Sequence, residues 1–118
     1  MLGLMQDWPL TVDRILDHAR SSFPRREIVT RTLEGPMART DYGTLHSRAK
    51  QVTSALRERS IALGDRIATL AWNTDRHMEV WYGAMGMGAV LHTVNPRLFP
   101  EQIAWIINHA EDKILFFD

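Results

Sequence analysis

The residues best suited to chemistry stand where a buried stretch of the chain ends. His92 lies near the carboxyl end of the apolar segment "AVLHTV", and Asn95 follows it directly before a proline. In open α/β sheets, ligands bind at the carboxyl ends of the strands, so an imidazole and a carboxamide there could contact a substrate. The simpler interpretation is a histidine bonded to the backbone and an asparagine that closes its own turn. We favour that interpretation and keep ligand contact as the alternative.

The remaining reactive side chains form no recognisable catalytic or metal-binding pattern. The chain has no cysteine, which excludes disulfides, thiolate catalysis and cysteine-ligated zinc. It shows no HExxH pattern, no serine in a nucleophile elbow and no G-x-x-x-x-G-K-[ST] loop. From the residues alone we therefore assign no catalytic, cofactor-binding or metal-binding residue. The histidines weighed for metal binding are His18, His46, His77, His92 and His109.

The glycines of "GAMGMGAV" invite a dinucleotide-binding interpretation, but they stand in the wrong context. That fingerprint needs glycines after a strand, opening a helix whose amides meet the phosphate. Here Gly83, Gly86 and Gly88 end a helical segment and lead into a strand. We predict that Gly88 stops the helix and that Gly83 and Gly86 let the helix lie close to the sheet.

The elements that position these residues follow from the hydrophobic periodicity. Apolar residues recur at helical spacing after Thr11 and after Asp41, which predicts a capped helix at each, and Gly64 is the expected stop of the second. Two short segments flank the turn at Glu34-Gly35-Pro36 and predict a β-hairpin. The expected inward faces are Val12, Ile15, Leu16 and Ala19 in the first helix, and Tyr42, Leu45, Ala49, Val52 and Leu56 in the second.

The second half of the chain has a different pattern. The segments "RIATLAW", "AVLHTV" and "KILFF" are continuously apolar, and they alternate with the helical segments "HMEVWYGAMGMG" and "PEQIAWIINHA". Strands buried on both faces pair in parallel through right-handed crossovers. The predicted fold class is α/β: part of a three-layer α/β/α arrangement with a mostly parallel sheet, plus an N-terminal helix and a β-hairpin. We expect Trp72, Trp81 and Trp105 in the core, and Trp8 as an anchor against something outside this domain.

Composition and charge narrow the classes of partner. The chain has 118 residues, 45% hydrophobic and 24% charged, which is typical of one globular domain. Lys plus Arg and Asp plus Glu number 14 each, so no basic excess would attract nucleic acid or an anionic membrane. No apolar run approaches the ~18 residues of a membrane-spanning helix, and the N-terminal segment lacks the basic flank of a signal peptide. We expect a cytoplasmic protein.

The order and wording of the second half resemble one family. The segments that carry the resemblance are "GDRIATLAWNTDRHMEVWYGAMGMGAVLHTVNPRLFPEQIAWIINHAEDKILFFD" and, more loosely, "DYGTLHSRAKQVTSAL". They resemble medium- and long-chain fatty acyl-CoA synthetases of the adenylate-forming ligase superfamily. The resemblance covers nearly all of the chain and is weakest around Gly35. It departs at Thr44, where relatives tend to carry Glu, and at Phe99, where a helix cap such as Ser is expected.

The resemblance implies that residues 1–118 are the N-terminal portion of a larger AMP-binding domain. The intact enzyme would activate a fatty acid with ATP to an acyl-adenylate and transfer the acyl group to CoA, with Mg²⁺ accompanying the ATP. The catalytic motifs of the family lie downstream of these residues. No site residue can therefore be carried over, no cofactor is assigned to residues 1–118, and this portion alone is expected to be inactive.

Two expectations concern assembly. A parallel sheet that stops after "KILFFD" should leave a hydrophobic edge and face, and near-zero net charge gives little protection against self-association. We therefore expect a homo-oligomer, most simply a dimer formed by exchange of the arm or of an edge strand. For the function, the alternative to an acyl-CoA ligase is a stand-alone α/β interaction or structural module without catalytic activity. The apolar arm comprises Met1, Leu2, Leu4, Met5, Trp8 and Leu10.

Overall fold

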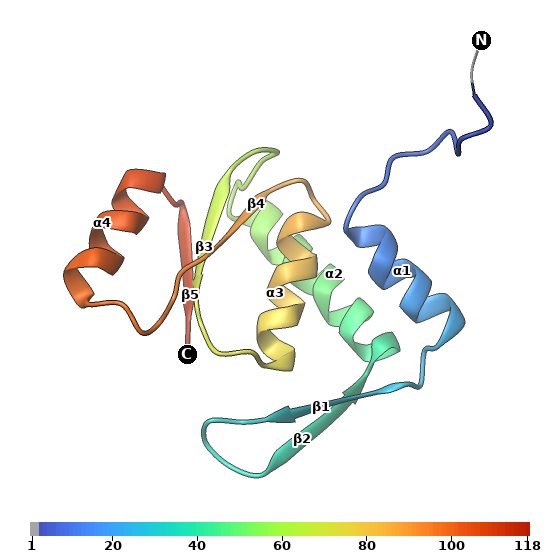
Figure 1. The fold of residues 1–118 in the computed structure, drawn as a ribbon, viewed down its shortest axis with the longest axis horizontal. Coiled ribbons are helices and arrows are strands. Elements are labelled where there is room, and N and C mark those ends of the chain that lie inside the picture. Colours follow the sequence, from blue (N-terminus) through green and yellow to red (C-terminus); the bar gives the residue numbers. More distant parts are fainter. Residues whose placement is uncertain (1–2) are drawn as a thin grey trace.

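The computed structural model describes residues 3–118 as four helices, a hairpin and a three-stranded sheet (Figure 1). Met1 and Leu2 of the predicted apolar arm lie outside the described residues. Elements in chain order are α1 (Asp13–Ser22), β1 (Glu27–Arg31), β2 (Met37–Asp41), α2 (Tyr42–Glu58), β3 (Arg66–Leu70), α3 (Asp75–Met85), β4 (Val90–Thr93), α4 (Pro100–Ala110) and β5 (Ile114–Phe117).

The three-stranded sheet confirms the predicted β-α-β-α-β order. Its strands run in the order β4-β3-β5, and β3 pairs in parallel with both neighbours. Helix α3 connects β3 to β4, whereas α4 connects β4 to β5 across β3. Figure 1 shows α4 on one side of the sheet and α2 and α3 on the other. The predicted α/β class and its three layers are therefore confirmed.

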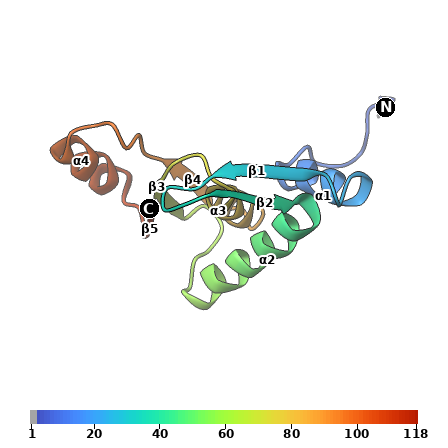
Figure 2. The ribbon, with the colours of Figure 1, turned by 90° about the horizontal axis from the view of Figure 1, so that it is seen from below.

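The hairpin forms where the turn signal predicted it. Strands β1 and β2 are antiparallel, with Glu27 opposite Asp41. Its turn is closed by Thr32, whose hydroxyl accepts from the N–H of Gly35 at 3.1 Å and donates to the carbonyl of Pro36 at 2.9 Å. The hairpin crosses one end of α2 and α3 (Figure 2).

The core consists of two clusters on the inner side of the sheet. The cluster between α2, α3 and the sheet contains Leu56, Ile61, Ile67, Ala84 and Ala89. The cluster beneath α1 contains Leu16, Leu45 and Ala49. The predicted inward stripe of α2 is thus confirmed.

The predicted apolar face of α1 is only partly right. Leu16 is its single buried residue, whereas Val12 and Ile15 remain 41% and 62% exposed. The helix contacts α2 along a narrow strip, so residues on either side of Leu16 stay in solvent.

The predicted helix ends are right at one place and wrong at two. Asp41 caps α2 as predicted, because its Oδ1 accepts the N–H of Thr44 at 2.7 Å. At α1 the cap position belongs to Val12, whose side chain cannot accept a hydrogen bond, so the prediction of Thr11 is wrong. Helix α2 ends at Glu58, well before Gly64. Ser60 takes the left-handed backbone (φ 62°) that turns the chain and lets Ile61 reach the core.

The glycines of α3 allow a close approach, but to a different partner from the one predicted. A Cβ on Gly83 would lie 2.7 Å from Cβ of Val52 and 2.8 Å from the carbonyl oxygen of Ala49. The absence of a side chain at Gly83 therefore lets α2 pack closely against α3. The prediction that this glycine brings the helix close to the sheet is wrong. Gly86 occupies the C-cap, and Gly88 has φ 83° in the turn that leads to β4.

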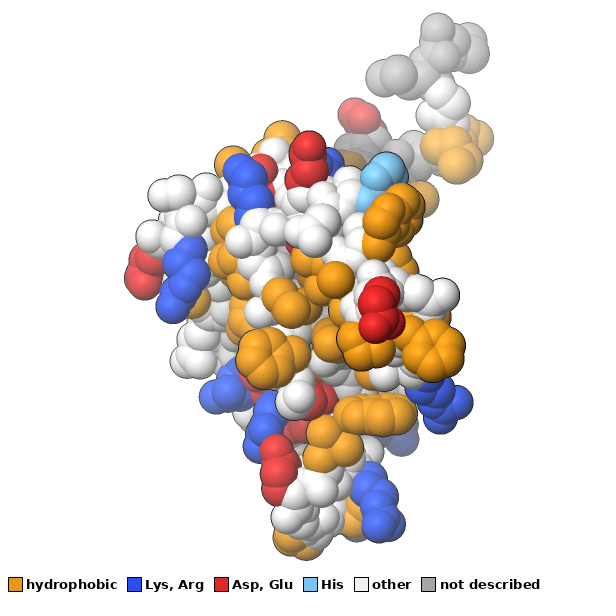
Figure 3. All heavy atoms as spheres, turned by 90° about the vertical axis from the view of Figure 1, so that its left-hand side faces the viewer, with side chains coloured by type: hydrophobic (Ala, Val, Ile, Leu, Met, Phe, Trp, Pro, Cys, Tyr) orange, Lys and Arg blue, Asp and Glu red, His pale blue; other side chains and the backbone are white. Residues whose placement is uncertain are grey.

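The prediction that three tryptophans lie in the core is wrong. Trp72, Trp81 and Trp105 are 45%, 43% and 64% exposed. Helix α4 spans Pro100–Ala110 and contains no buried residue, and Phe117 of β5 is 73% exposed. Figure 3 shows hydrophobic side chains gathered on this side of the molecule. Within residues 3–118, no helix is long and apolar enough to cross a membrane.

Candidate functional site

The carboxyl edge of the parallel sheet is the first candidate site. The chain leaves β3 toward one side of the sheet to form α3, and leaves β4 toward the other side to form α4. In open α/β sheets this change of direction opens a crevice where ligands bind. The side chains that follow the two strands are therefore the first to consider.

His77, in the first turn of α3, is held at this edge by two hydrogen bonds. Its Nδ1 lies 3.1 Å from the carbonyl oxygen of Trp72, and its Nε2 lies 2.9 Å from Oγ1 of the buried Thr69. A carbonyl can only accept, so Nδ1 carries a proton, and the neutral ring accepts the Thr69 hydroxyl proton at Nε2. The sequence had not singled out His77. The sequence signal that could have pointed to His77 is Thr74, a helix-capping residue shortly after a strand. Thr74 caps α3 by accepting the N–H of His77 at 3.3 Å.

A cavity of about 370 Å³ opens beside His77. One wall is apolar, and the rim carries Arg76 paired with Glu34 of the hairpin turn at 3.5 Å. This arrangement could bind a small molecule with an apolar part. The hydroxyl of Thr69 is bonded to the base His77, but Thr69 is only 1% exposed, so we assign it no role as a nucleophile. The lining residues are Glu34, Thr69, Ala71, Arg76, His77, Val80, Phe116, Phe117 and Asp118.

His92 is bonded to a carboxylate, which makes the prediction of a backbone partner wrong. Its Nδ1 lies 2.7 Å from Oδ2 of Asp112, whose side chain is completely buried. The reason is tertiary, because Ala68 lies between His92 and Leu115 in the sheet register. The partner, Asp112, lies 20 positions further along the chain, in the turn between α4 and β5, so no local pattern indicates it. Oδ1 of Asp112 has no hydrogen-bond partner in the described part of the chain.

Asn95 closes a turn, as predicted. Its Oδ1 accepts the N–H of Arg97 at 3.0 Å, and its carbonyl accepts from Leu98 at 3.3 Å. The Arg97 guanidinium lies 5.9 Å from the centre of the Trp72 ring, so this turn contacts the loop that follows β3. His92 and Asn95 thus have separate partners and form no common site.

Metal ligation finds no support in the part of the chain that the structure describes. No group of three His, Asp or Glu side chains there lies close enough together to hold a metal ion. Four of the histidines instead bond to carboxylates, a carbonyl or hydroxyls, as His46 does to Asp17 at 3.1 Å. The ring of His109 stacks on Trp105, with 4.6 Å between the ring centres.

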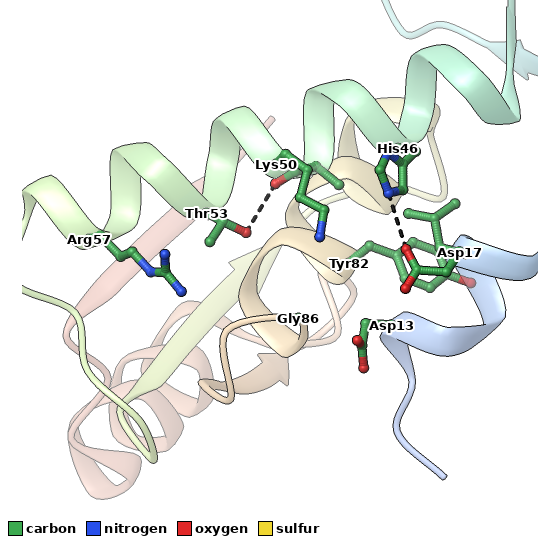
Figure 4. Close-up of a pocket in the computed structure, with 10 residues that line it drawn as sticks. Asp13, Asp17, His46, Lys50, Thr53, Arg57, Tyr82 and Gly86 are labelled. Atoms are coloured by element: carbon green, nitrogen blue, oxygen red, sulfur yellow. Dashed lines mark hydrogen bonds and ion pairs between the residues drawn. The ribbon is translucent and has the colours of Figure 1, made fainter. Parts of the chain in front are cut away.

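A second cavity, of about 130 Å³, lies between α1, α2 and the end of α3 (Figure 4). Its walls carry charged groups of both signs around the Tyr82 ring. Burial raises the pKa of the Tyr82 phenol, and the neighbouring Tyr42 adds to the effect, so this group stays neutral near pH 7. The lining residues are Asp13, Leu16, Asp17, His46, Ala49, Lys50, Thr53, Arg57, Tyr82 and Gly86.

Comparison with known proteins finds one matching family and several relatives. Residues 16–118 match the family described as AMP-binding enzyme. The 3-methylmercaptopropionyl-CoA ligase of Ruegeria lacuscaerulensis is 48% identical over 100% of this chain and 22% of its own length. The long-chain-fatty-acid–CoA ligase of Thermus thermophilus is 46% identical over 97% of the chain and 21% of its own length. The medium-chain-fatty-acid–CoA ligase of Ectopseudomonas oleovorans is 42% identical over 100% and 22%.

Solved structures agree on the fold. Mycobacterium tuberculosis fatty acyl CoA synthetase superposes with a TM-score of 0.81 at 24% identity, over 91% of this chain and 21% of that one. The chain spans about a fifth (22%) of the length of the curated relatives that it matches along its full length.

Proposed function

Because the chain belongs to the AMP-binding enzyme family, we propose that residues 1–118 form the N-terminal portion of the adenylation domain of an acyl-CoA ligase. The resemblance to medium- and long-chain fatty acyl-CoA synthetases is confirmed at the level of the family. The observation that carries the proposal is the match of residues 16–118 to that family, together with CoA ligases 42–48% identical to the chain.

The proposed reaction has two steps. A carboxylate oxygen of the fatty acid attacks the α-phosphorus of ATP, and the bond to the β-phosphate breaks to release pyrophosphate. The CoA thiol, losing its proton, then attacks the acyl carbon of the acyl-adenylate, and AMP leaves as the thioester forms. Mg²⁺ would accompany the ATP. We assign none of these steps to a residue of the chain, and residues 1–118 would supply the sheet and helices that support the site.

The proposed substrate is a medium- or long-chain fatty acid. Relatives named for those substrates are 42% and 46% identical to the chain. A second candidate is 3-methylmercaptopropionate, because two relatives named for that ligation are 48% and 46% identical. These values do not separate the candidates, so the substrate must be measured. Hexanoate, palmitate and 3-methylmercaptopropionate would be compared by kcat/KM in the full-length enzyme.

Reading the encoding DNA beyond codon 118 tests the domain assignment. We expect an open reading frame that continues through a Ser/Thr/Gly-rich phosphate loop, and the full-length product should form acyl-CoA only when ATP, Mg²⁺ and CoA are all present. A stop codon after Asp118, with a cooperative monomeric fold, would favour the stand-alone module instead. A full-length product without ligation activity on any of the three acids would also contradict the proposal.

Residues 1–118 alone are proposed to be inactive. The groups that stabilise developing charge during adenylate formation usually supply the largest part of catalysis, and the resemblance places them downstream. A hydroxamate or pyrophosphate-release assay on the 118-residue chain should give no turnover above a heat-denatured control. Measurable turnover with fatty acid, ATP and CoA would show that this proposal is wrong.

We also propose self-association, most simply as a homodimer. Support comes from exposed apolar residues in the arm and at the sheet, with Leu4, Leu10 and Phe117 at 109%, 88% and 73% exposure. Light scattering over a range of concentrations tests this proposal, and a clean monomer at high concentration would contradict it. The cytoplasmic location stays a prediction, to be checked by cell fractionation.

A further inference from the structure

The cavity between α1, α2 and α3 contains charges of both signs that the fold leaves unpaired. Lys50 and Arg57 extend from α2, and Asp13 comes from the facing helix α1 (Figure 4). Within residues 3–118, none of these three belongs to any ion pair. Opposite charges on facing walls attract one another, so a cavity that holds them apart offers both to a ligand.

The spacing of these residues explains why they face one cavity. His46, Lys50, Thr53 and Arg57 are separated by three or four positions and therefore follow one face of α2. Asp13 and Asp17 are likewise one turn apart on α1. One pair links these two sets of residues: Nε2 of His46 lies 3.1 Å from Oδ1 of Asp17.

Gly86 has no side chain to fill the part of the cavity next to Asp13. A Cβ at this position would lie 2.7 Å from the carbonyl oxygen of Tyr82 and 3.8 Å from Cβ of Asp13. Gly86 is also the C-cap of α3, the end of a helix where the dipole is negative. Together with Asp13 and Asp17, this end of the cavity favours a positive group.

The opposite wall favours a negative group. The exposed side chains of Lys50 and Arg57 supply an ammonium and a guanidinium, whereas the Thr53 hydroxyl contributes no free donor, because it donates its proton to the carbonyl of Gly83 at 2.7 Å. The carboxylates of Asp13 and Asp17 balance the cations of Lys50 and Arg57 in formal charge. A net anion or cation would therefore meet repulsion from one wall, whereas a neutral dipolar molecule could satisfy both.

We propose that this cavity binds a compact dipolar ion, with one ammonium group and one carboxylate group. The volume of about 130 Å³ corresponds to roughly four water molecules at about 30 Å³ each, which suits a ligand of about five or six non-hydrogen atoms. Glycine and β-alanine have this size and charge pattern. The proposal does not rest on the ligase assignment, and its test involves no turnover.

An NMR titration of the ¹⁵N-labelled 118-residue chain tests the binding. We expect β-alanine to cause saturable shifts at the amides of Lys50, Arg57 and Gly86, with a Kd on the order of 1 mM. Propionate lacks the ammonium group and propylamine lacks the carboxylate, so each should bind at least about tenfold more weakly. Equal binding of propionate or propylamine would overturn the dipolar assignment. The absence of saturable shifts with β-alanine up to about 50 mM, a large excess over that Kd, would overturn the site itself.

Substitutions separate specific binding from a general surface effect. Lys50→Gln and Asp13→Asn should each weaken β-alanine binding by about tenfold, because each removes a charge from one wall. Arg20→Gln is the matched control, since Arg20 is an exposed residue of α1 that does not line the cavity. Thermal melting by circular dichroism shows that each variant is folded. Unchanged affinity in both folded cavity variants, or equal weakening in Arg20→Gln, would overturn the proposal.

Discussion

Helices α2 and α4 both carry apolar faces, but only α2 contains fully buried residues, whereas the isoleucines of α4 are half-buried. In α2, Leu45, Ala49 and Leu56 are 1%, 4% and 1% exposed, because α1, α3 and the sheet pack against one face of the helix. Helix α4 carries three isoleucines and Trp105, yet it contains no buried residue. The difference shows that an apolar helix face becomes fully buried only where another element of the fold packs against it.

The starts of the two helices differ in the same way. Asp41 caps α2 through its own side chain. Helix α4 begins after Phe99, whose side chain has no acceptor, and Gln102 instead reaches back to accept the N–H of Phe99 at 3.2 Å. Helix α2, in the inner layer, is thus stabilised by both local and tertiary contacts, and α4, in the outer layer, has fewer of each.

The largest expected effect is at the centre of the inner layer. Leu56→Ala should lower the free energy of unfolding by about 2–5 kcal/mol, because it leaves a cavity among Ile61, Ile67 and Ala84. Leu63→Ala makes the same chemical change at a residue 83% exposed and should cost less than about 0.5 kcal/mol. Urea denaturation followed by circular dichroism measures both. Equal losses would mean that burial does not determine the cost of truncating these two leucines.

The contact between α3 and α2 should tolerate no added methyl group. Gly83→Ala is expected to destabilise the fold by about 1–3 kcal/mol, because the new Cβ would overlap Val52 and the backbone of Ala49. Gly35→Ala is the control, since its Cβ would meet only Thr32 Oγ1, at 3.9 Å. A neutral or stabilising Gly83→Ala would show that the helices can separate without cost.

The ion pair that joins the start of β3 to the start of β5 should lose its stabilising effect at acid pH. Asp65 accepts from Lys113 at 2.7 Å and from the N–H of Ala62 at 2.8 Å, and these bonds hold its pKa below the ordinary value of 3.8. Because the folded-state pKa is lowered, the stabilisation is fully present above the ordinary value. It is lost as the pH falls through the lowered value.

Asp65→Asn should therefore flatten the dependence of unfolding free energy on pH below about pH 4, and its loss of unfolding free energy should be largest at neutral pH, where the parent chain has the full stabilisation. Denaturation curves at several pH values would measure the slope for the variant and the parent chain. Asp7→Asn, in the exposed arm, serves as the control and should leave the slope unchanged. Identical slopes for Asp65→Asn and the parent chain would contradict a stabilising role for this pair.

The smallest effect on stability is expected on α4. Trp105→Gln should change the unfolding free energy by less than about 0.5 kcal/mol, because the side chain is already 64% exposed. The same change should lower the average mass in light scattering if the outer face drives self-association. A large loss of stability would show that Trp105 is packed more tightly than its exposure indicates.

Much of the fold was predictable because its signals are local. The stripe of α2, the turn at Gly35 and the alternation of buried strands with helices each depend on residues close together in the chain. The Asp41 cap and the Asn95 turn were also predictable, since each side chain bonds a backbone group two or three residues away. The family resemblance extended that reading to a proposed function.

The candidate sites were less predictable, because their partners are distant in the sequence. His92 was expected to bond the backbone and instead bonds Asp112, and His77 was considered only as a possible metal ligand, although it bonds Thr69. No periodicity relates residues on different strands and turns, and a single chain gives no measure of which face of an apolar helix will find a neighbour.

The linear order of residues by itself determined the elements, their parallel pairing and the family, because each depends on periodicity, short-range capping or a run of consecutive residues. Only the tertiary structure decided which helices are buried, which histidine meets which carboxylate, and where unpaired charges face a common cavity. Those outcomes depend on distances across the sheet and between helices, and such distances exist only once the chain has folded.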